Sequence, residues 1–333
     1  MRKRDTVTMP TVSVCIPVHN GARFLTQAIE SVLEQSFTDY ELVICDDASS
    51  DETPGICRSY RDPRVRYVRF EERGGQAGSF NRCFGQARGE LFTLLHADDF
   101  YLPALLAQRI RQLKEHPEVG FACGAIRKVD VNGAPASTSM PWAESRLFPS
   151  GGLVEPLLHG CVVLYLGLVV RRDRWIPFRT DMTWGHDWDW GLRLAEKNAV
   201  YYDSEPLACY RVHDESGTAE NLNAAKNGAQ ERRILEEALA RSASAGGRAA
   251  LCRRSALRAL ALRHMYFAEQ ALLEGRGWVA RYNLRYALRA DLSLAGRLTT
   301  WAILVASVAG RGWYEGFRYV RHLGRGRRAS SND

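Results

Sequence analysis

Short apolar runs alternate with helical apolar spacing along the first hundred residues of the chain. The run from Val12 to Ile16 ends at Pro17, and segment 21–35 then repeats apolar side chains at the spacing of one helix face. The same order recurs, with further strands predicted at 41–45, 65–70 and 90–95 and further helices at 78–87 and 103–116. Because strands and helices alternate, the pattern predicts an α/β fold with a doubly wound, mainly parallel, Rossmann-like sheet.

The pattern becomes less regular after this first part. Strands are predicted at 119–131 and 162–170, and the segment between them, 134–152, is rich in Pro, Ser and Gly and predicts a mobile loop. Two short strands are expected at 201–202 and 207–212.

Almost all of the chain beyond residue 220 has a helical pattern. We therefore expect an α/β domain over 11–220, a C-terminal helical extension over 221–325, and flexible ends at 1–10 and 326–333.

Charge is distributed unevenly along the 333 residues, although 46% hydrophobic residues are enough for a large core. Of 45 Lys+Arg and 38 Asp+Glu, 20 and 8 lie in residues 226–333, which leaves 25 and 30 for the rest. The last part therefore carries about +12 and the first about −5. A basic helical region favours an anionic partner such as a membrane surface, and a solvated or packed helical bundle explains the same composition.

Several function classes are disfavoured by the composition. The eight cysteines contain no C-x-x-C pair, no apolar stretch follows the basic N-terminus, and no recognised base-reading module accompanies the basic helices. The longest uncharged apolar runs, 161–170 and 301–309, fall short of the about 20 residues that cross a bilayer. We expect a cytoplasmic protein without a transmembrane helix and without a nucleic-acid partner.

Polar clusters follow the predicted strands at their carboxyl ends. These clusters are P-V-H-N at 17–20, Asp46-Asp47, and H-A-D-D at 96–99. Ligands of doubly wound sheets bind beyond this edge, and two adjacent carboxylates need a cation, a hydroxyl or solvent because they repel each other. The clusters predict a ligand site with a divalent metal, whereas Asp98 and Asp99 taken alone are also typical of a solvated turn before a helix.

Two later segments add candidate chemistry. T-W-G-H-D-W-D-W-G-L-R-L at 183–194 combines carboxylates with three tryptophans, which either stack on a sugar or pack in the core. Y-R-V-H-D-E-S at 210–216 adds an arginine and a histidine, and such a histidine is structural as often as it is a ligand.

The ordered set of motifs resembles the inverting glycosyltransferases of family 2, which have the GT-A fold. The matching segments are V-S-V-C-I-P-V-H-N (12–20), E-L-V-I-C-D-D-A-S-S-D-E-T (41–53), G-G-Q-A-G-S-F-N-R-C (74–83), L-L-H-A-D-D-F-Y-L-P (94–103) and H-D-W-D-W-G-L-R-L (186–194). The resemblance covers residues 11 to 215 and makes 11–220 the catalytic domain. It implies transfer of a sugar from a UDP-, GDP- or dTDP-linked donor to a hydroxyl acceptor in polysaccharide or glycoconjugate assembly.

The resemblance also implies which residues bind the donor. Asp47 corresponds to the residue that recognises the base, with Asp46 as a less certain partner, and the backbone of Pro17, Val18 and His19 lines the base and ribose pocket. The motif at 74–83 supplies two further donor contacts, Gly75 and Gln76.

A divalent metal, Mn²⁺ or Mg²⁺, is implied beside the diphosphate. Asp99 is the favoured metal ligand, Asp98 is a candidate for ribose and metal, and His213 approaches the metal or the diphosphate. Arg211 corresponds to a position suited to neutralising phosphate charge. His96 stands where many members carry an Asp, which removes about one negative charge and predicts either weaker metal binding or a preference for Mn²⁺.

The general base is implied to be Asp187, with Asp189 in reserve, because inversion needs a group that takes the proton of the acceptor hydroxyl. His186 stands where the family usually has a Glu. The acceptor is expected to be a saccharide or a lipid-linked molecule, with peripheral membrane contact at the inner face through the basic helices. The alternative is a catalytically silent module that binds nucleotide sugars or acts as a scaffold.

Overall fold

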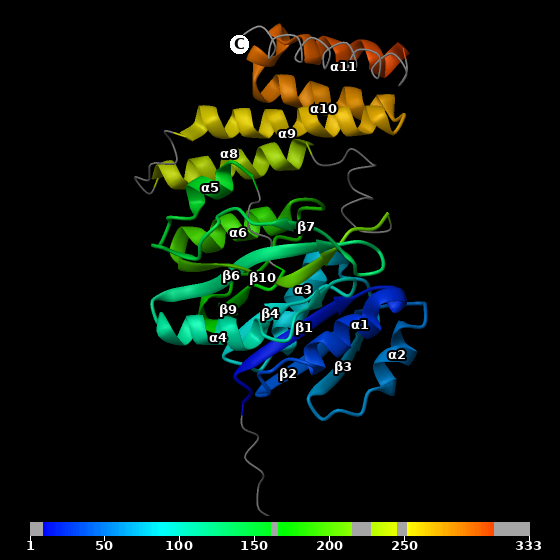
Figure 1. Ribbon diagram of the computed structural model, residues 1–333, viewed down its shortest axis with the longest axis vertical. Coiled ribbons are helices and arrows are strands. Elements are labelled where there is room, and N and C mark those ends of the chain that lie inside the picture. Colours follow the sequence, from blue (N-terminus) through cyan, green and yellow to red (C-terminus); the bar gives the residue numbers. More distant parts are fainter. Residues whose placement is uncertain (1–8, 161–165, 215–227, 245–251, 310–333) are drawn as a thin grey trace, which may run out of the picture. The chain divides into compact units, whose positions relative to one another are not determined.

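The computed structural model describes residues 9–160, 166–214, 228–244 and 252–309 (Figure 1). The chain divides into an α/β unit, residues 1–157 and 161–213, and a helical unit, residues 158–160 and 214–333. The expected flexible ends lie outside the described residues, apart from Met9 and Pro10.

The α/β unit is built on one 10-stranded sheet. Its strands are β1 (Val12–Val18), β2 (Tyr40–Asp47), β3 (Val65–Phe70), β4 (Leu91–Leu94), β5 (Phe100–Tyr101), β6 (Val119–Val129), β7 (Pro135–Ser139), β8 (Arg146–Phe148), β9 (Val169–Arg171) and β10 (Ala199–Arg211). All seven residues of β1 are buried, as expected for a strand that is covered on both faces of the sheet.

The strand order along the sheet is β3-β2-β1-β4-β9-β6-β10-β5. β1 pairs in parallel with β2 and β4, β2 with β3, and β6 with β10, whereas the short β9 runs antiparallel between β4 and β6. The chain turns in one direction from β1 to β3 and resumes on the other side at β4. The predicted doubly wound, mainly parallel sheet is thereby confirmed, and the point where the strand order reverses lies between β1 and β4.

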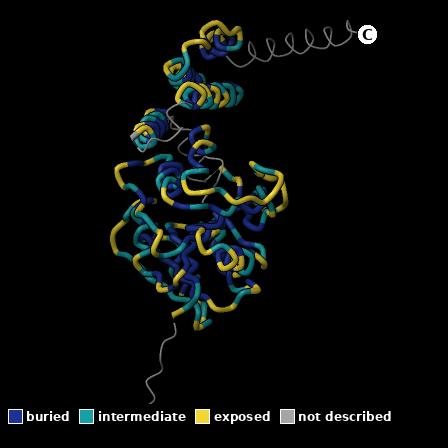
Figure 2. The backbone as a smooth tube through the Cα atoms, turned by 90° about the vertical axis from the view of Figure 1, so that its left-hand side faces the viewer, coloured by how far each residue is buried: buried dark blue, intermediate teal, exposed yellow. Residues whose placement is uncertain are grey.

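Helices connect the strands and cover the sheet. They are α1 (Ala22–Leu33), α2 (Thr53–Ser59), α3 (Gly75–Gln86), α4 (Leu105–Glu115), α5 (Val154–Leu158) and α6 (His186–Lys197). In α1 the residues Leu25, Ala28, Ile29 and Val32 are buried, which is the i, i+3, i+4, i+7 spacing of one helix face. These side chains join the strands in one core. Figure 2 shows the buried residues of the chain in dark blue.

Two expectations for the second part of this unit are wrong. Segment 134–152, expected as a mobile loop, contains β7, which pairs with β6, and β8, which pairs with β10. The two short strands expected at 201–202 and 207–212 form the single strand β10, whose register shifts between Asp203 and Ala208. At this shift Asp203 accepts hydrogen bonds from Gln112 and from the buried Arg109, at 2.7 and 2.6 Å, so the turn-like sequence D-S-E-P remains in the strand.

The helical unit contains α8 (Gly228–Ser244), α9 (Arg253–Leu273), α10 (Gly277–Ala290) and α11 (Leu298–Ala309), which confirms the expected C-terminal helices. Figure 1 shows α9 and α10 side by side, and residues of α9, α10 and α11 share one apolar core. None of the helices in the described part of the chain has the length and hydropathy that crossing a bilayer requires.

Candidate active site

The polar clusters predicted at the strand ends lie at the carboxyl edge of the sheet. His19 follows β1, Asp46 and Asp47 end β2, and residues 96–99 follow β4. Ligand atoms of His96, Asp98 and Asp99 all lie within 4.8 Å of one another. In the described residues they form the one group of three or more His, Cys, Asp or Glu side chains arranged to hold a metal ion.

The two carboxylates of this cluster differ in their surroundings. Asp99 is buried, its Oδ1 accepts the backbone N–H of Arg211 at 2.8 Å, and its Oδ2 lies 3.2 Å from Nδ1 of His96. The Asp98 side chain is 34% exposed, and its Oδ2 lies 3.1 Å from Nε2 of His213. Asp98 therefore offers the accessible oxygen, while Asp99 is already held by the protein.

Burial and charge also shift the proton affinities in the cluster. Burial raises the pKa of Asp99. Burial alone would lower the pKa of His96, but the hydrogen bond and charge of Asp99, together with the charges of Asp98 and Asp187, raise it. A cation placed among these groups would relieve the repulsion between the carboxylates.

The donor set fits a divalent transition metal. Two carboxylates and one imidazole lie within reach, with His213 beside Asp98. Carboxylate oxygens suit Mg²⁺ and Mn²⁺, and an imidazole among them favours Mn²⁺ over Mg²⁺. The sequence prediction that these residues converge agrees with the geometry.

Arg211 lies buried at the end of β10 and is bonded within the protein. Its Nε donates to the backbone oxygen of Asp98 at 2.8 Å, its Nη1 donates to that of Val131 at 2.7 Å, and its Nη2 donates to Gln27. Its guanidinium lies 4.6 Å from the ring centre of Phe24. These contacts anchor the turn that carries Asp98, and binding of phosphate by Arg211 stays a prediction.

Asp47 is held beside the start of α3. Its carboxylate accepts the N–H of Gly74 at 2.8 Å and Nη1 of Arg82 at 2.7 Å, while its backbone oxygen lies 2.8 Å from Nδ1 of His19. Gly75 adopts the left-handed φ of 68°, and Gln76 is exposed. Arg82 lies inside the 74–83 motif but was not among the predicted donor-site residues.

Asp46 makes a different set of contacts from Asp47. Its buried carboxylate accepts hydrogen bonds from Ser49 N at 2.8 Å, the Tyr67 hydroxyl at 2.6 Å and Arg69 Nη1 at 2.9 Å. Burial opposes ionisation, but the bonds from Ser49 and Tyr67 and the charge of Arg69 lower the pKa of Asp46 overall. Its contact with a donor stays a prediction, and its bonds shape the turn after β2.

The start of α6 lies close to His96, Asp98 and Asp99, here called the metal-type cluster. Phe80 packs between two imidazoles, with ring centres 5.8 Å from His96 and 5.7 Å from His186. Asp187, next along α6, is half-buried and acts on the charge of His96. The candidate base and the Asp98-Asp99 turn are thus neighbours, and no spacing in the sequence indicated that Phe80 joins them.

The other acid of this helix is enclosed by arginines. Asp189 is fully buried, 2.8 Å from Nε of Arg193 and 3.7 Å from Nη1 of Arg179. Trp188 and Trp190 are also buried, and their indole N–H groups donate to the backbone oxygens of Leu157 and Ile176. For these two tryptophans, packing in the core is therefore the correct alternative.

Comparisons with known proteins show to which family the sequence is similar. The model of glycosyl transferase family 2 matches residues 13–169, which include the strand-end clusters after β1, β2 and β4. An uncharacterized glycosyltransferase of Rickettsia typhi is 27% identical over 304 residues, which cover 88% of this chain and 89% of that protein.

Solved structures share the fold. S. aureus TarS 1-349 in complex with UDP-GlcNAc aligns with a TM-score of 0.55 at 18% identity, covering 89% of this chain and 91% of that one. The Pyrobaculum calidifontis mannosyltransferase in complex with GDP-Man and Mn²⁺ aligns with a TM-score of 0.51 at 21% identity, covering 91% and 81%. By its match to the family model and its similarity to curated glycosyltransferases, the chain belongs to glycosyl transferase family 2 and is a glycosyltransferase.

Proposed function

We propose that this glycosyltransferase moves a sugar from a nucleoside-diphosphate donor, UDP-, GDP- or dTDP-linked, to a hydroxyl acceptor with inversion at the anomeric carbon. The observation that carries the proposal is the group formed by His96, Asp98 and Asp99, with the half-buried Asp187 close enough to act on His96. Metal-type ligands and a candidate base beside each other are what such a transfer requires.

The donor lies across the point where the strand order reverses. In this proposal the nucleoside binds near Pro17, Val18 and His19, with Asp47 accepting an N–H of the base and Arg82 moving aside or stacking on the base. Gly75 and Gln76 contact the donor from the start of α3. The two aligned structures hold UDP-GlcNAc and GDP-Man, which supports a nucleotide sugar and leaves the base open.

The metal belongs beside the diphosphate. Asp98, Asp99 and His213 are the proposed ligands, and His96 adds a nitrogen to the set. When bound, Mn²⁺ or Mg²⁺ supplies Lewis-acid stabilisation of the negative charge on the leaving nucleoside diphosphate. Arg211 holds the Asp98 backbone in position, and its own proposed contact with phosphate would require one of its present bonds to open.

Asp187 is the proposed general base. It takes the proton from the acceptor hydroxyl as that oxygen attacks from the face opposite the leaving group. Asp189 is poorly placed for this role, because it is fully buried and paired with Arg193 and Arg179. The proposed acceptor is a saccharide or a lipid-linked molecule in polysaccharide or glycoconjugate assembly, reached at the inner face of the membrane.

The second candidate is a catalytically silent module. His96 and His186 favour it, because each stands at a position where the family usually has an acid. The two candidates differ in donor turnover. Release of UDP or GDP from a nucleotide sugar in the presence of Mn²⁺ would exclude the silent module, and binding without any turnover would support it.

Transfer should depend on Asp187 and Asp98 in different ways. After a screen of UDP-, GDP- and dTDP-sugars identifies the donor, we expect Asp187→Asn to lower kcat by about 10²–10⁴-fold while nucleotide binding with Mn²⁺ is kept. Asp98→Asn should weaken Mn²⁺-dependent nucleotide binding as well as turnover, and chelation of the metal should mimic it.

The matched control is Asp173→Asn, since the Asp173 side chain is 70% exposed and lies away from this cluster in a 3-10 turn. Calorimetric titration and turnover assays measure both properties. Near-normal turnover in Asp187→Asn and Asp98→Asn would contradict the proposed mechanism.

A further inference from the structure

One helix of the helical unit is apolar on both of its sides. The sequence of α11, L-T-T-W-A-I-L-V-A-S-V-A, contains no charged residue. Ala302, Ile303 and Ala306 pack into the core that α11 shares with α9 and α10. The outward side chains, here called the α11 face, are each 38–80% exposed: Leu298, Trp301, Leu304, Val305 and Val308.

Such a face is unusual on a surface that meets only water. Single exposed apolar residues are common, but a contiguous apolar strip along a whole helix marks a site of interaction. The spacing of 298, 301, 305 and 308 places these side chains along one line of the helix. The α11 face therefore needs an occupant, and the charges around it indicate which one.

Positive charge without compensating acid lies next to the α11 face. Arg297 directly precedes α11, and Arg281 donates to the backbone oxygen of Ser307 near its end. Arg285 follows Arg281 at four-residue spacing along α10 and is exposed. Among the described residues, none of these three arginines has a carboxylate within salt-bridge distance.

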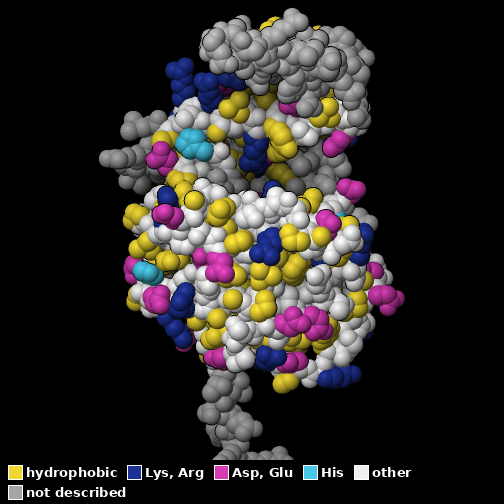
Figure 3. All heavy atoms as spheres, viewed as in Figure 1, with side chains coloured by type: hydrophobic (Ala, Val, Ile, Leu, Met, Phe, Trp, Pro, Cys, Tyr) yellow, Lys and Arg dark blue, Asp and Glu magenta, His cyan; other side chains and the backbone are white. Residues whose placement is uncertain are grey.

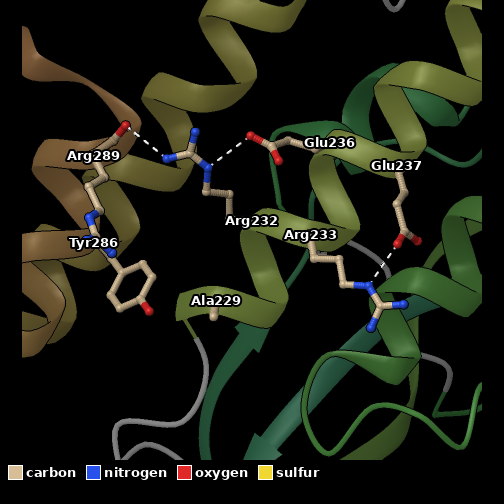
Figure 4. Close-up of a pocket in the computed structure, with 7 residues that line it drawn as sticks. All are labelled: Ala229, Arg232, Arg233, Glu236, Glu237, Tyr286 and Arg289. Atoms are coloured by element: carbon tan, nitrogen blue, oxygen red, sulfur yellow. Dashed lines mark hydrogen bonds and ion pairs between the residues drawn. The ribbon is translucent and has the colours of Figure 1, made fainter.

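Other parts of the protein are charge-compensated. On the face of the α/β unit that Figure 3 shows, acidic and basic side chains are interspersed. In α8, Arg232 pairs with Glu236 and Arg233 with Glu237, at 2.9 and 2.8 Å (Figure 4). The uncompensated arginines thus distinguish the surroundings of α11 from α8 in the same unit.

We propose that the α11 face docks on the surface of an anionic lipid bilayer. Trp301 and the aliphatic side chains enter the boundary between headgroups and acyl chains, and the arginines at both ends of the helix pair with lipid phosphates. The described part of α11 has 12 residues, too few to span the bilayer, and in this proposal it lies along the bilayer surface.

Two other occupants fit the same surface less well. A symmetric contact with a second copy would bury the apolar face but would also bring two sets of unpaired arginines together, and like charges oppose association. Nucleic acid would satisfy the arginines and leave the apolar side chains unexplained, because such interfaces are polar.

The inference rests on the proposed function in one respect: a bilayer-bound enzyme meets a lipid-linked acceptor at the same surface. Docking is measured without donor or acceptor. Loss of docking would therefore leave the catalytic proposal intact, and loss of turnover would leave docking intact.

The test uses the full-length protein and sedimentation with vesicles. We expect binding to vesicles of phosphatidylglycerol and phosphatidylcholine, much weaker binding to pure phosphatidylcholine, and a decrease with added salt. Leu298→Glu combined with Val308→Glu, the two most exposed positions of the α11 face, should weaken binding on the order of tenfold or more. Arg285→Gln combined with Arg297→Gln should weaken binding on the order of tenfold, and only to the anionic vesicles.

The matched control is Met140→Glu combined with Leu147→Glu, which adds the same charge at exposed apolar positions of the α/β unit and should leave binding unchanged. Circular dichroism and thermal unfolding verify that every variant is folded. Failure of the unmodified protein to bind anionic vesicles would overturn the proposal. So would unchanged binding after the α11 substitutions, or a dimer that these substitutions dissociate, since either result assigns the face to residues 310–333 or to a second copy.

Discussion

Asp187 and Asp189 are two positions apart on one helix and have different surroundings. Side chains at i and i+2 of a helix point in different directions, so Asp187 meets the metal-type cluster while Asp189 points into the core beside Arg193. The sequence predicted both acids as candidates. Asp187 is the candidate base and Asp189 forms structural ion pairs, because the two side chains point in different directions from the helix and because Arg179 and Arg193 lie next to Asp189.

Histidine 186 should make stability depend on pH. Burial lowers the pKa of His186 below its usual value of about 6.5. As pH falls below about 6.5, the unfolded chain takes up a proton at this residue that the folded protein resists, so stability is lost in that direction. We expect the free energy of unfolding of the metal-free protein to fall less between pH 7 and pH 5 in His186→Gln than in the unmodified protein.

Comparing the pH dependence of stability in the two proteins separates the contribution of His186 from that of His96. The pKa of His96 is raised in the folded state, so its contribution is present at low pH and is lost as pH rises through that raised pKa. Urea unfolding at several pH values measures both curves. Parallel curves for His186→Gln and the unmodified protein would contradict the prediction.

The sequence predicted which polar residues follow the strands, but it did not predict which side chains contact them. The clusters after β1, β2 and β4 follow from local apolar runs that end in polar residues. Three contacts join segments that lie far apart in the sequence: Arg82 with Asp47, Phe80 with two imidazoles, and Gln27 with Arg211. No local sequence pattern predicts such contacts.

Among the elements, α6 depends on the backbone conformation at its first turn. Gly185 precedes the helix in the left-handed region, at φ 71°, and directs His186 and Asp187 toward the cluster. A side chain at this position would clash with its own backbone, and only Asn among the larger residues tolerates the conformation well.

Alanine substitution should therefore have opposite effects at two glycines of this segment. Gly185→Ala should lower the free energy of unfolding by about 1–2 kcal/mol, and Gly185→Asn by less. Gly191 lies inside α6, and a methyl group there would meet no atom within 4 Å, so Gly191→Ala should raise stability by about 0.5–1 kcal/mol.

Chemical denaturation of the three variants measures these changes. Turnover should fall in Gly185→Ala, because Asp187 is two residues away, and should be kept in Gly191→Ala. Equal stability of Gly185→Ala and Gly191→Ala would show that the backbone at 185 does not require glycine.

The predictable elements were those with strong local periodicity. α1 has apolar side chains at the spacing of one helix face and β1 is a short apolar run, and the predicted positions of both agree with the structure within a few residues. β7 reads P-A-S-T-S and β8 has three residues, so neither has an apolar alternation that distinguishes it from a loop. Their strand geometry comes from pairing with β6 and β10, which is tertiary information.

At the scale of the whole molecule, each of the two units contains an apolar core among its described residues. One core joins the sheet with α1 and α4, and the other joins α9, α10 and α11. The proposed donor site uses residues of the α/β unit alone.

Calorimetry of the full chain should then show two unfolding transitions. The nucleotide of the identified donor, added with Mn²⁺ at about 100 times its Kd, should stabilise the α/β unit by about 2.7 kcal/mol and raise only one of the two transitions. Anionic vesicles should act on the other transition. A single transition that nucleotide shifts as a whole would show instead that the units unfold together.

Arg211 has a consequence for how this sequence can diverge. Most of its bonds are to backbone oxygens, at Asp98 and Val131, and every amino acid carries that oxygen. Val131 can therefore be exchanged for many residues without loss of this hydrogen bond. Arg211 cannot be exchanged in the same way, because its bonds require a long side chain with several N–H donors in a fork. Among distant relatives with this turn, we expect the residue at position 131 to vary and the arginine at position 211 to stay the same. A residue can therefore line the turn without being required for its conformation.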